Sequence, residues 1–298
     1  MPDHACDRAQ CASILVPRDH RHINQMRMLW GTVARVLVIP QYLCSRPAAP
    51  LTTANRYASG CLRIVSRCHD LLVMTKAEYA AQAAAQDDWA PGWLAIDASF
   101  ESVYPGVTPA HLGSALHARA IFGGEEYLDG ISLFPSPNGY QHLLTYGMSK
   151  LYADEEAYGG DFSGWGYEMT MKVRATSPDD CWWAVNSLRN LARYTYTSKR
   201  WFEPYQFISG QGRPLRADGG TILTSYVTAP DTEVAGIDTV HGRVDFIRLV
   251  GITQTELDWV AGDGPDGAPE RARDLVERIT SDGNPHLVTN LERTSSYI

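Results

Sequence analysis

Acidic side chains gather in one short stretch of the chain and could carry out acid–base chemistry. Asp154, Glu155 and Asp161 lie within eight residues, and His142 precedes the first of them by twelve positions. Paired carboxylates that share a cleft with an imidazole move protons in many hydrolases. A hydrolase that uses these side chains is therefore one function that the sequence allows. The competing interpretation is a solvated loop, which is the commoner outcome for an acidic run.

Other catalytic and metal-binding patterns are missing from the sequence. It contains no phosphate-binding glycine loop, no dinucleotide-binding glycine motif and no nucleophile elbow. Cys181 stands beside acidic residues, which raise the pKa of a thiol and make it a poor nucleophile. The histidines after residue 74 show no metal-ligand spacing: His111, His117, His142, His241 and His286. We therefore expect neither a cofactor nor a metal ion.

Residues 263–269, DGPDGAP, carry aspartates at a spacing that occurs in calcium loops. The segment lacks the third ligand position and the terminal glutamate of such a loop. Its glycine, proline and aspartate content is typical of a surface turn. We therefore predict a loop here and no calcium site.

Aromatic residues and glycines are interspersed between Tyr152 and Tyr167. The stretch also contains Tyr158, Phe162 and Trp165, together with four glycines. Glycine allows a close backbone approach, and Tyr and Trp supply a large contact area with few rotamers to freeze. This composition fits a surface that binds a polypeptide, with Tyr158 and Trp165 among the contacts. The alternative is that the rings close one end of the hydrophobic core.

The elements that must position these residues alternate irregularly along the chain. Capping residues followed by apolar stripes predict helices over 75–86, 92–102, 178–195, 253–260 and 272–279. Apolar runs and alternating patterns predict strands over 131–134, 143–146, 167–174, 222–227, 243–250 and 287–288. This order predicts the α+β class, as a mixed α/β sandwich around a twisted, largely antiparallel sheet.

The composition changes abruptly near residue 74. The chain has 298 residues, a net charge of −8 and 44% hydrophobic residues, which are enough for a sizeable core. Residues 1–73 contain nine Arg, four Asp and neither Lys nor Glu, and so carry +5. Residues 74–298 carry −13, which argues against binding to a nucleic-acid backbone. No apolar run reaches the ~18 residues of a transmembrane helix.

Residues 1–73 admit three interpretations. The first, which the composition favours, is an extension that is disordered or that does not belong to the natural protein. In the latter case the natural chain starts at Met74. A targeting segment is the second, because residues 26–39 combine a basic start with an apolar run. A Cys/His metal module is the third, although it lacks paired C-x-x-C motifs. Under the first interpretation, Cys181 is the one cysteine that remains. A lone cysteine is typical of a reducing compartment, so we predict a cytoplasmic protein. We also predict a single domain over residues 74–298.

Seven short blocks follow one another in a characteristic order after residue 89. They are GWLAID (92–97), LDGIS (128–132), HLLTYGMS (142–149), SGWGYEMT (163–170), LRNLARY (188–194), FIRLVGIT (246–253) and TNLER (289–293). This succession resembles the Suppressor of fused domain, in the form found in bacterial stand-alone proteins. Seven blocks in order are a stronger signal than any one of them, and none lies before residue 74.

The resemblance implies the mixed α/β fold of that family and a role in protein binding rather than catalysis. In animals the family member restrains Gli transcription factors in Hedgehog signalling and holds its peptide ligand as an added strand. The resemblance aligns Tyr152 with a tyrosine that the animal protein uses, and Asp161 is the nearest match to its aspartate across a shorter loop. The animal protein also has a C-terminal domain that completes the peptide cleft, and we expect this chain to lack that wall.

We therefore expect a non-catalytic module that sequesters a toxin or peptide partner, with no nucleic-acid or membrane partner. Bacterial relatives have been proposed as immunity proteins, and an acidic domain suits a basic toxin. The predicted contact residues are Tyr152, Tyr158, Asp161 and Trp165. The hydrolase remains the alternative, and a purely structural scaffold without an exposed aromatic patch is a third class.

Overall fold

The computed structural model describes residues 74–113 and 127–298, with the exception of residue 263. The prediction for residues 1–73 and the histidine at 117 lie outside these residues. The described helices are α2 (Lys76–Ala85), α3 (Pro91–Val103), the 3-10 helix η1 (Pro178–Cys181), α5 (Trp182–Ser198), α6 (Gln254–Ala261) and α7 (Gly264–Ser281). The strands are β1 (Ala110–Gly113), β2 (Gly130–Ser136), β3 (Tyr140–Tyr146), β4 (Phe162–Val173), β5 (Phe207–Ser209), β6 (Leu223–Pro230), β7 (Ile237–Thr239) and β8 (Gly242–Thr253).

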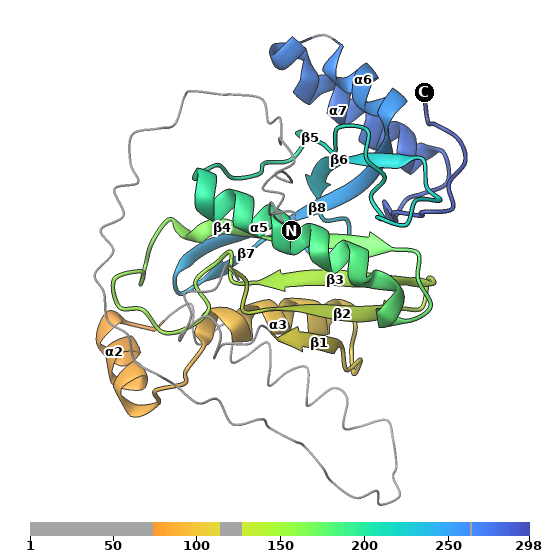
Figure 1. The fold of residues 1–298 in the computed structure, drawn as a ribbon. Coiled ribbons are helices and arrows are strands. Elements are labelled where there is room, and N and C mark those ends of the chain that lie inside the picture. Colours follow the sequence, from red (N-terminus) through yellow and green to blue (C-terminus); the bar gives the residue numbers. More distant parts are fainter. Residues whose placement is uncertain (1–73, 114–126, 263) are drawn as a thin grey trace, which may run out of the picture.

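These eight strands form one sheet (Figure 1). Its order is β1-β2-β3-β4-β8-β6-β5, and β7 pairs with the beginning of β8. The central pair, β4 and β8, runs parallel, whereas the other described pairs are antiparallel. The predicted α+β class with a largely antiparallel sheet is confirmed. No helix within the described ranges is long and apolar enough to cross a membrane.

Capping residues start the helices where the sequence predicts them. Thr75 and Thr253 each accept a hydrogen bond from the amide three residues later, and the glutamate there bonds back to the cap amide. Ser177 forms the same reciprocal pair with Asp180 and opens η1, which leads directly into α5. These caps satisfy amides that have no partner inside the helix.

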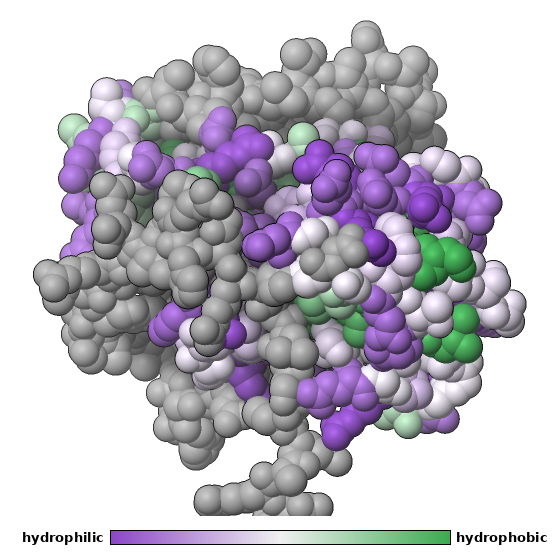
Figure 2. Space-filling model, turned by 90° about the horizontal axis from the view of Figure 1, so that it is seen from above, coloured by the Kyte–Doolittle hydropathy of each residue, from purple (hydrophilic) through white to green (hydrophobic). Residues whose placement is uncertain are grey.

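Helices cover both faces of the sheet (Figure 1). The apolar stripe of α5 packs against one face, where Met169 and Met171 of β4 are completely buried. The opposite face is covered by α3 near β2 and β3, and by α6 and α7 near β6 and the end of β8. Figure 2 views the molecule from above, and much of the described surface there is hydrophilic.

Because helices cover both faces of the sheet, the alternating pattern in β4 does not separate buried from exposed side chains. Glu168, Thr170 and Lys172 lie on the face of β4 opposite Met169 and Met171, but all three are completely buried. The period-two pattern identifies which side chains share a face, whereas exposure depends on what packs over that face.

Two predictions at the C-terminal end are wrong. The predicted loop over 263–269 is helical from Gly264, because an apolar stripe continues back through Ala272 to Ala268 and is buried against the sheet. The predicted strand over 287–288 is absent. Leu287 has a φ of 50°, outside the β region, and the segment makes only an isolated bridge between Thr289 and Val173.

Candidate partner-binding surface

The connection between β3 and β4, residues 147–161, carries most of the predicted contact residues. Its first part is tied to the start of α3, where the Leu151 carbonyl accepts the amides of Gly92 (3.0 Å) and Trp93 (3.3 Å). The Ala153 amide donates to the Trp89 carbonyl at 3.0 Å. A Cβ at position 92 would lie 2.0 Å from the Lys150 carbonyl oxygen, so this approach requires glycine. The connection is therefore held in place by backbone contacts.

A buried hydrogen-bond chain fixes the middle of the connection. The Asp154 amide donates to the Tyr79 hydroxyl at 2.7 Å, and that hydroxyl donates to Nε2 of His241 at 2.7 Å. Nδ1 of His241 then donates to the Lys150 carbonyl at 3.1 Å, which places the proton of the neutral ring on Nδ1. Burial lowers the pKa of His241, and this favours the same neutral form.

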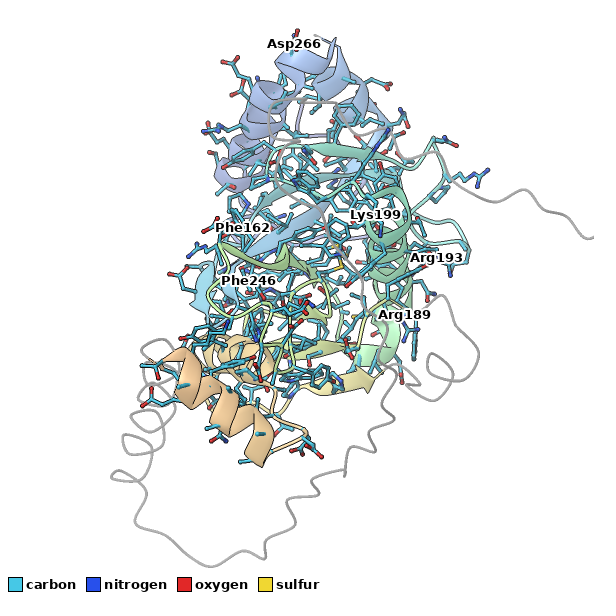
Figure 3. All side chains as sticks on the ribbon, turned by 90° about the vertical axis from the view of Figure 1, so that its left-hand side faces the viewer. Phe162, Arg189, Arg193, Lys199, Phe246 and Asp266 are labelled. Atoms are coloured by element: carbon cyan, nitrogen blue, oxygen red, sulfur yellow. The ribbon has the colours of Figure 1, made fainter. Side chains whose placement is uncertain are left out.

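Tyr152 and Asp161 are both exposed at the ends of this clamped segment. Tyr152 is 36% exposed, and its hydroxyl donates to Asp129 at 3.4 Å. Asp161 is exposed, and its backbone carbonyl accepts the Arg243 amide at 3.0 Å. Phe162 follows directly and is 57% exposed, the largest exposed fraction among the large hydrophobic residues described. Figure 3 shows Phe162 on the side of the sheet away from the labelled arginines of α5.

Trp165 lies on another side of the connection. It is half-buried against the α5 cluster, and its ring meets Tyr196 edge-on with a centroid distance of 5.6 Å. The Lys199 ammonium lies 5.7 Å from the centre of the same ring. The Trp165 amide donates to the Met148 carbonyl at 2.9 Å. Trp165 therefore joins the connection to the end of α5.

Tyr158 packs toward α2. Its ring lies 4.9 Å from that of Tyr79, and its hydroxyl donates to the Met74 carbonyl. It belongs to a small cluster with Trp89 and Val240. The four predicted residues therefore share one segment but point in different directions.

The exposed part of the connection is acidic. Glu155, Glu156 and Asp161 are exposed. Asp154 pairs with the Lys150 ammonium at 2.6 Å. Partial burial raises the pKa of Asp154, but the hydrogen bond and charge of Lys150 outweigh it and lower that pKa overall. This carboxylate stays ionised near neutral pH.

The structure does not assemble the alternative hydrolase site. His142 pairs with Lys172 near the end of β4, whereas Asp161 immediately precedes the first residue of that strand. The regular part of β4 from Tyr167 to Lys172 alone separates these positions by roughly 16 Å. Within the described ranges, no three His, Cys, Asp or Glu residues gather as metal ligands would. Burial and the charge of Asp180 raise the pKa of Cys181 to about 12.

His142 instead belongs to a buried ionic network. The network lies between α3 and the pair α6 and α7, the helices that cover this face of the sheet. Its Nε2 lies 3.0 Å from Asp231, which also pairs with Arg248, and its Nδ1 lies 2.8 Å from the Tyr104 hydroxyl. Lys172 and Glu233 complete the network at 3.0 Å. Burial lowers the pKa of His142 to about 4, and the nearby Asp231 opposes this shift only in part. Burial raises the pKa of Asp231, but Arg248 and His142 bring it well below its usual range.

Several residues that support this surface or form the buried network carry no local signal in the sequence. Tyr79 and His241 are 162 positions apart, and Asp231 is 89 positions from His142. Neither separation along the sequence indicates that the two side chains meet in the folded chain. Phe162 carried one signal, an aromatic residue beside the glycines, although the sequence alone did not single it out as a contact.

Comparison with known proteins agrees with this architecture. A family model described as Suppressor of fused protein (SUFU) matches residues 124–294. The crystal structure of a Sufu–Fu complex contains a chain with 24% identity and a TM-score of 0.58, over 70% of this chain and 93% of that chain. The crystal structure of Drosophila Suppressor of Fused has 25% identity and a TM-score of 0.59, over 70% of this chain and 51% of that chain.

The match thus spans about half the length of the Drosophila protein. A search of the curated proteins found no match. The family model covers more than half of the chain, and the matched residues include β2 to β8 together with α5, α6 and α7. The chain belongs to the Suppressor of fused family.

Proposed function

We propose that this chain is a non-catalytic, cytoplasmic module that binds and sequesters a protein or peptide partner. Membership in the Suppressor of fused family is the observation that carries the proposal, since a member has been crystallised in a complex with Fu. Within the family we favour a bacterial immunity role, in which the partner is a toxin. Nucleic acids and membranes are not partners in this proposal.

The proposed contact surface is the exposed part of residues 152–162. Tyr152, Asp161 and Phe162 present aromatic and acidic groups to solvent on a backbone that is held by α2 and α3. A rigid aromatic contact loses little side-chain entropy on binding and is a common energetic anchor. In this proposal Tyr158 and Trp165 position the segment and contribute their accessible edges.

Charge supports a basic partner. Glu155, Glu156 and Asp161 lie on the proposed surface, and residues 74–298 carry a net −13. Opposite charges accelerate encounter, and salt screens them. We therefore expect the association rate constant to fall as the salt concentration rises, while the dissociation rate constant changes less.

The decisive experiment has two stages. The partner is first identified by co-purification from the native host and mass spectrometry. Its affinity is then measured by titration calorimetry for the wild type and for Tyr152→Ala and Asp161→Ala. We expect each substitution to cost about 2 kcal/mol of binding free energy if these side chains are anchors.

Two exposed residues elsewhere provide matched controls. Asp266→Ala removes a carboxylate from α7, far from Phe162 in Figure 3, and Trp182→Ala removes an exposed ring from the start of α5. Both controls should keep the wild-type affinity. Unchanged affinity in the Tyr152 and Asp161 variants would exclude this surface. Turnover of a small substrate that is lost with one acid or imidazole would exclude the binding function.

A further inference from the structure

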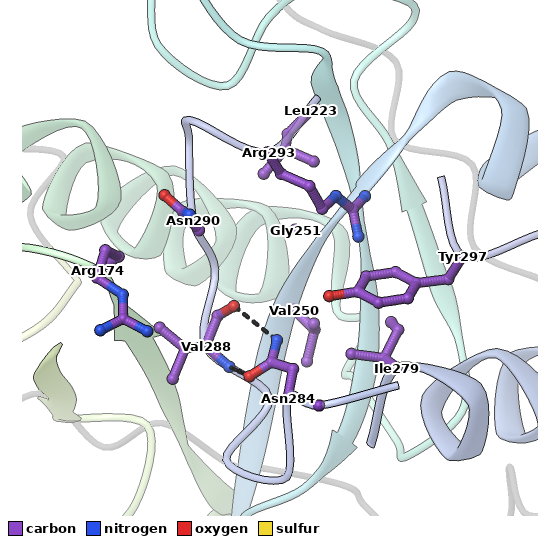
Figure 4. A pocket seen from close by; sticks show the side chains of 11 residues that line it. Arg174, Leu223, Val250, Gly251, Ile279, Asn284, Val288, Asn290, Arg293 and Tyr297 are labelled. Carbon is purple, nitrogen blue, oxygen red and sulfur yellow. Dashed lines mark hydrogen bonds between the residues drawn. The ribbon is translucent and has the colours of Figure 1, made fainter. Parts of the chain in front are cut away.

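A small pocket lies between the sheet and the C-terminal segment (Figure 4). Its volume is about 190 Å³, and it is outside the surface proposed for the partner. The end of β4, the strands β6 and β8, the last turn of α7 and residues 284–297 form its walls. The side chains that matter below are Arg174, Asn284, Asn290, Arg293 and Tyr297.

The wall made by residues 284–290 is rigid. Thr289 is bonded to both neighbouring strands: its amide donates to the Lys172 carbonyl at 2.7 Å, and its hydroxyl accepts the Gly251 amide at 2.9 Å. The side chain of Asn284 bonds both backbone groups of Val288, at 2.8 and 2.9 Å. The pocket is therefore preformed, and its shape does not depend on a ligand.

Arg293 lines the pocket and carries an unsatisfied donor. One end of its guanidinium is held by the buried carboxylate of Glu256 at 2.5 Å, and its plane lies 4.7 Å from the centre of the Tyr297 ring. Its Nε is buried and has no hydrogen-bond partner in the described part of the chain. A buried N–H without an acceptor is costly, so an acceptor that reaches this atom through a small movement of the Arg293 side chain would be stabilised.

The other polar groups around the pocket are also donors or are free to donate. The Asn290 side chain uses its oxygen to accept the Glu292 amide at 3.1 Å, which leaves its NH₂ group available as a donor. The Tyr297 hydroxyl makes no hydrogen bond to the other lining residues drawn in Figure 4. Arg174 stands at the rim, where it donates to the Gly139 carbonyl at 3.2 Å, and it forms no ion pair with a described residue. No Asp or Glu lines the pocket in the described ranges, so the lining offers N–H and O–H groups, and the charge of Arg174 is not paired with a described carboxylate, whereas that of Arg293 is paired with Glu256.

We propose that this pocket binds a small oxyanion, and that a phosphate group fits it better than a carboxylate. Arginine forms strong charge-assisted hydrogen bonds with both groups. Arg174, Arg293 and Tyr297 surround the space from different sides (Figure 4). Donors that converge from several directions match a tetrahedral anion, whereas a planar carboxylate offers its two oxygens in one plane. The volume admits an inorganic phosphate or the phosphate end of a small molecule.

The test titrates inorganic phosphate into the full-length chain by calorimetry, at constant ionic strength, with acetate as the second ligand. We expect saturable binding of phosphate and weaker binding of acetate. Tyr297→Phe removes only the hydroxyl, and Arg174→Gln removes the rim charge. Each should weaken phosphate binding about tenfold. Arg293→Lys keeps a cation beside Glu256 but removes Nε, and should weaken binding as well.

Arg216→Gln is the matched control, because Arg216 is an exposed arginine that pairs with Asp218 outside the pocket. It should bind phosphate like the wild type. Circular dichroism checks that each variant folds. The phosphate affinity of Tyr297→Phe tests the proposal even if Arg293→Lys does not fold. Absence of saturable phosphate binding, or equal binding by the wild type and Tyr297→Phe, overturns the proposal. Tighter binding of acetate overturns the choice of phosphate.

Discussion

Three of the four charged side chains around His142 have no access to solvent. The side chains of Asp231, Lys172 and Arg248 are completely buried, and that of Glu233 is 17% exposed. Two carboxylates therefore meet two cations, and charge balance leaves the imidazole of His142 neutral. Removing one member would leave an uncompensated buried charge, which is among the most destabilising changes in a protein core.

This arrangement predicts how stability depends on pH. The folded pKa of His142 is about 4, below the ordinary value of 6.5. As the pH falls through 6.5 toward 4, the unfolded chain binds a proton that the folded chain does not bind. The contribution of His142 to the free energy of unfolding should fall by about 2 kcal/mol between pH 7 and pH 5.

Urea denaturation of the wild type and His142→Gln at the two pH values measures this contribution. The comparison is needed because burial raises the pKa of Glu168 to about 7 and that of Asp97 to about 6, and these shifts act in the opposite direction. His286→Gln, at an exposed position beside Glu233, tests whether His142 is the source. Identical pH dependence in the wild type and His142→Gln would contradict the prediction.

Among the secondary-structure elements, α2 and α3 act as a support for the proposed contact surface. The first amides of α3 bind the Leu151 carbonyl, and Tyr79 of α2 bonds Asp154 and His241. Free amides at a helix start need an acceptor, and here the connection between β3 and β4 supplies it. The position of Tyr152 thus depends on a helix more than fifty residues earlier in the sequence.

Gly92→Ala tests this support. The new Cβ would lie 2.0 Å from the Lys150 carbonyl oxygen, so the helix and the connection must move apart. We expect a loss of about 3 kcal/mol in the free energy of unfolding and weaker partner binding. Gly113→Ala is the control, since among the described residues its Cβ meets nothing closer than 3.9 Å, and it should change stability by less than about 1 kcal/mol. Equal stability of the two variants would show that the contact is dispensable.

Over the entire chain, the net charge changes sign at residue 74. The described hydrophobic clusters are built from residues between Met74 and Tyr297, and they join helices and strands from all parts of that range. The net charge is +5 before residue 74 and −13 from there onward. We therefore keep the prediction of one folding unit over 74–298, preceded by a segment of different composition.

A chain that starts at Met74 should accordingly fold on its own. We expect its free energy of unfolding in urea to lie within about 1 kcal/mol of the full-length value, with a single cooperative transition. Partner affinity should also be retained, because the proposed contact residues all lie after Met74. A loss of several kcal/mol, or of the cooperative transition, would show that residues 1–73 contribute to the folded core.

Elements whose signals are local could be predicted from the amino-acid sequence. The capping residues Thr75, Ser177 and Thr253 start helices because their hydrogen bonds reach only two or three residues ahead. The buried stripe of α5 and the alternation in β4 repeat within one element. The beginning of α7 and the short strands β1, β5 and β7 were not predicted, because packing against distant strands stabilises them more than their own residues do.

The aromatic and acidic character of residues 152–167 could also be read from the sequence, and the ordered blocks indicated the family. Which of these side chains remain exposed became clear only from the folded arrangement. Tyr152 and Phe162 stay in solvent, whereas Trp165 packs against α5 and Tyr158 against Tyr79. Exposure depends on neighbours that lie far away in the sequence, and the folded chain alone brings those neighbours into contact.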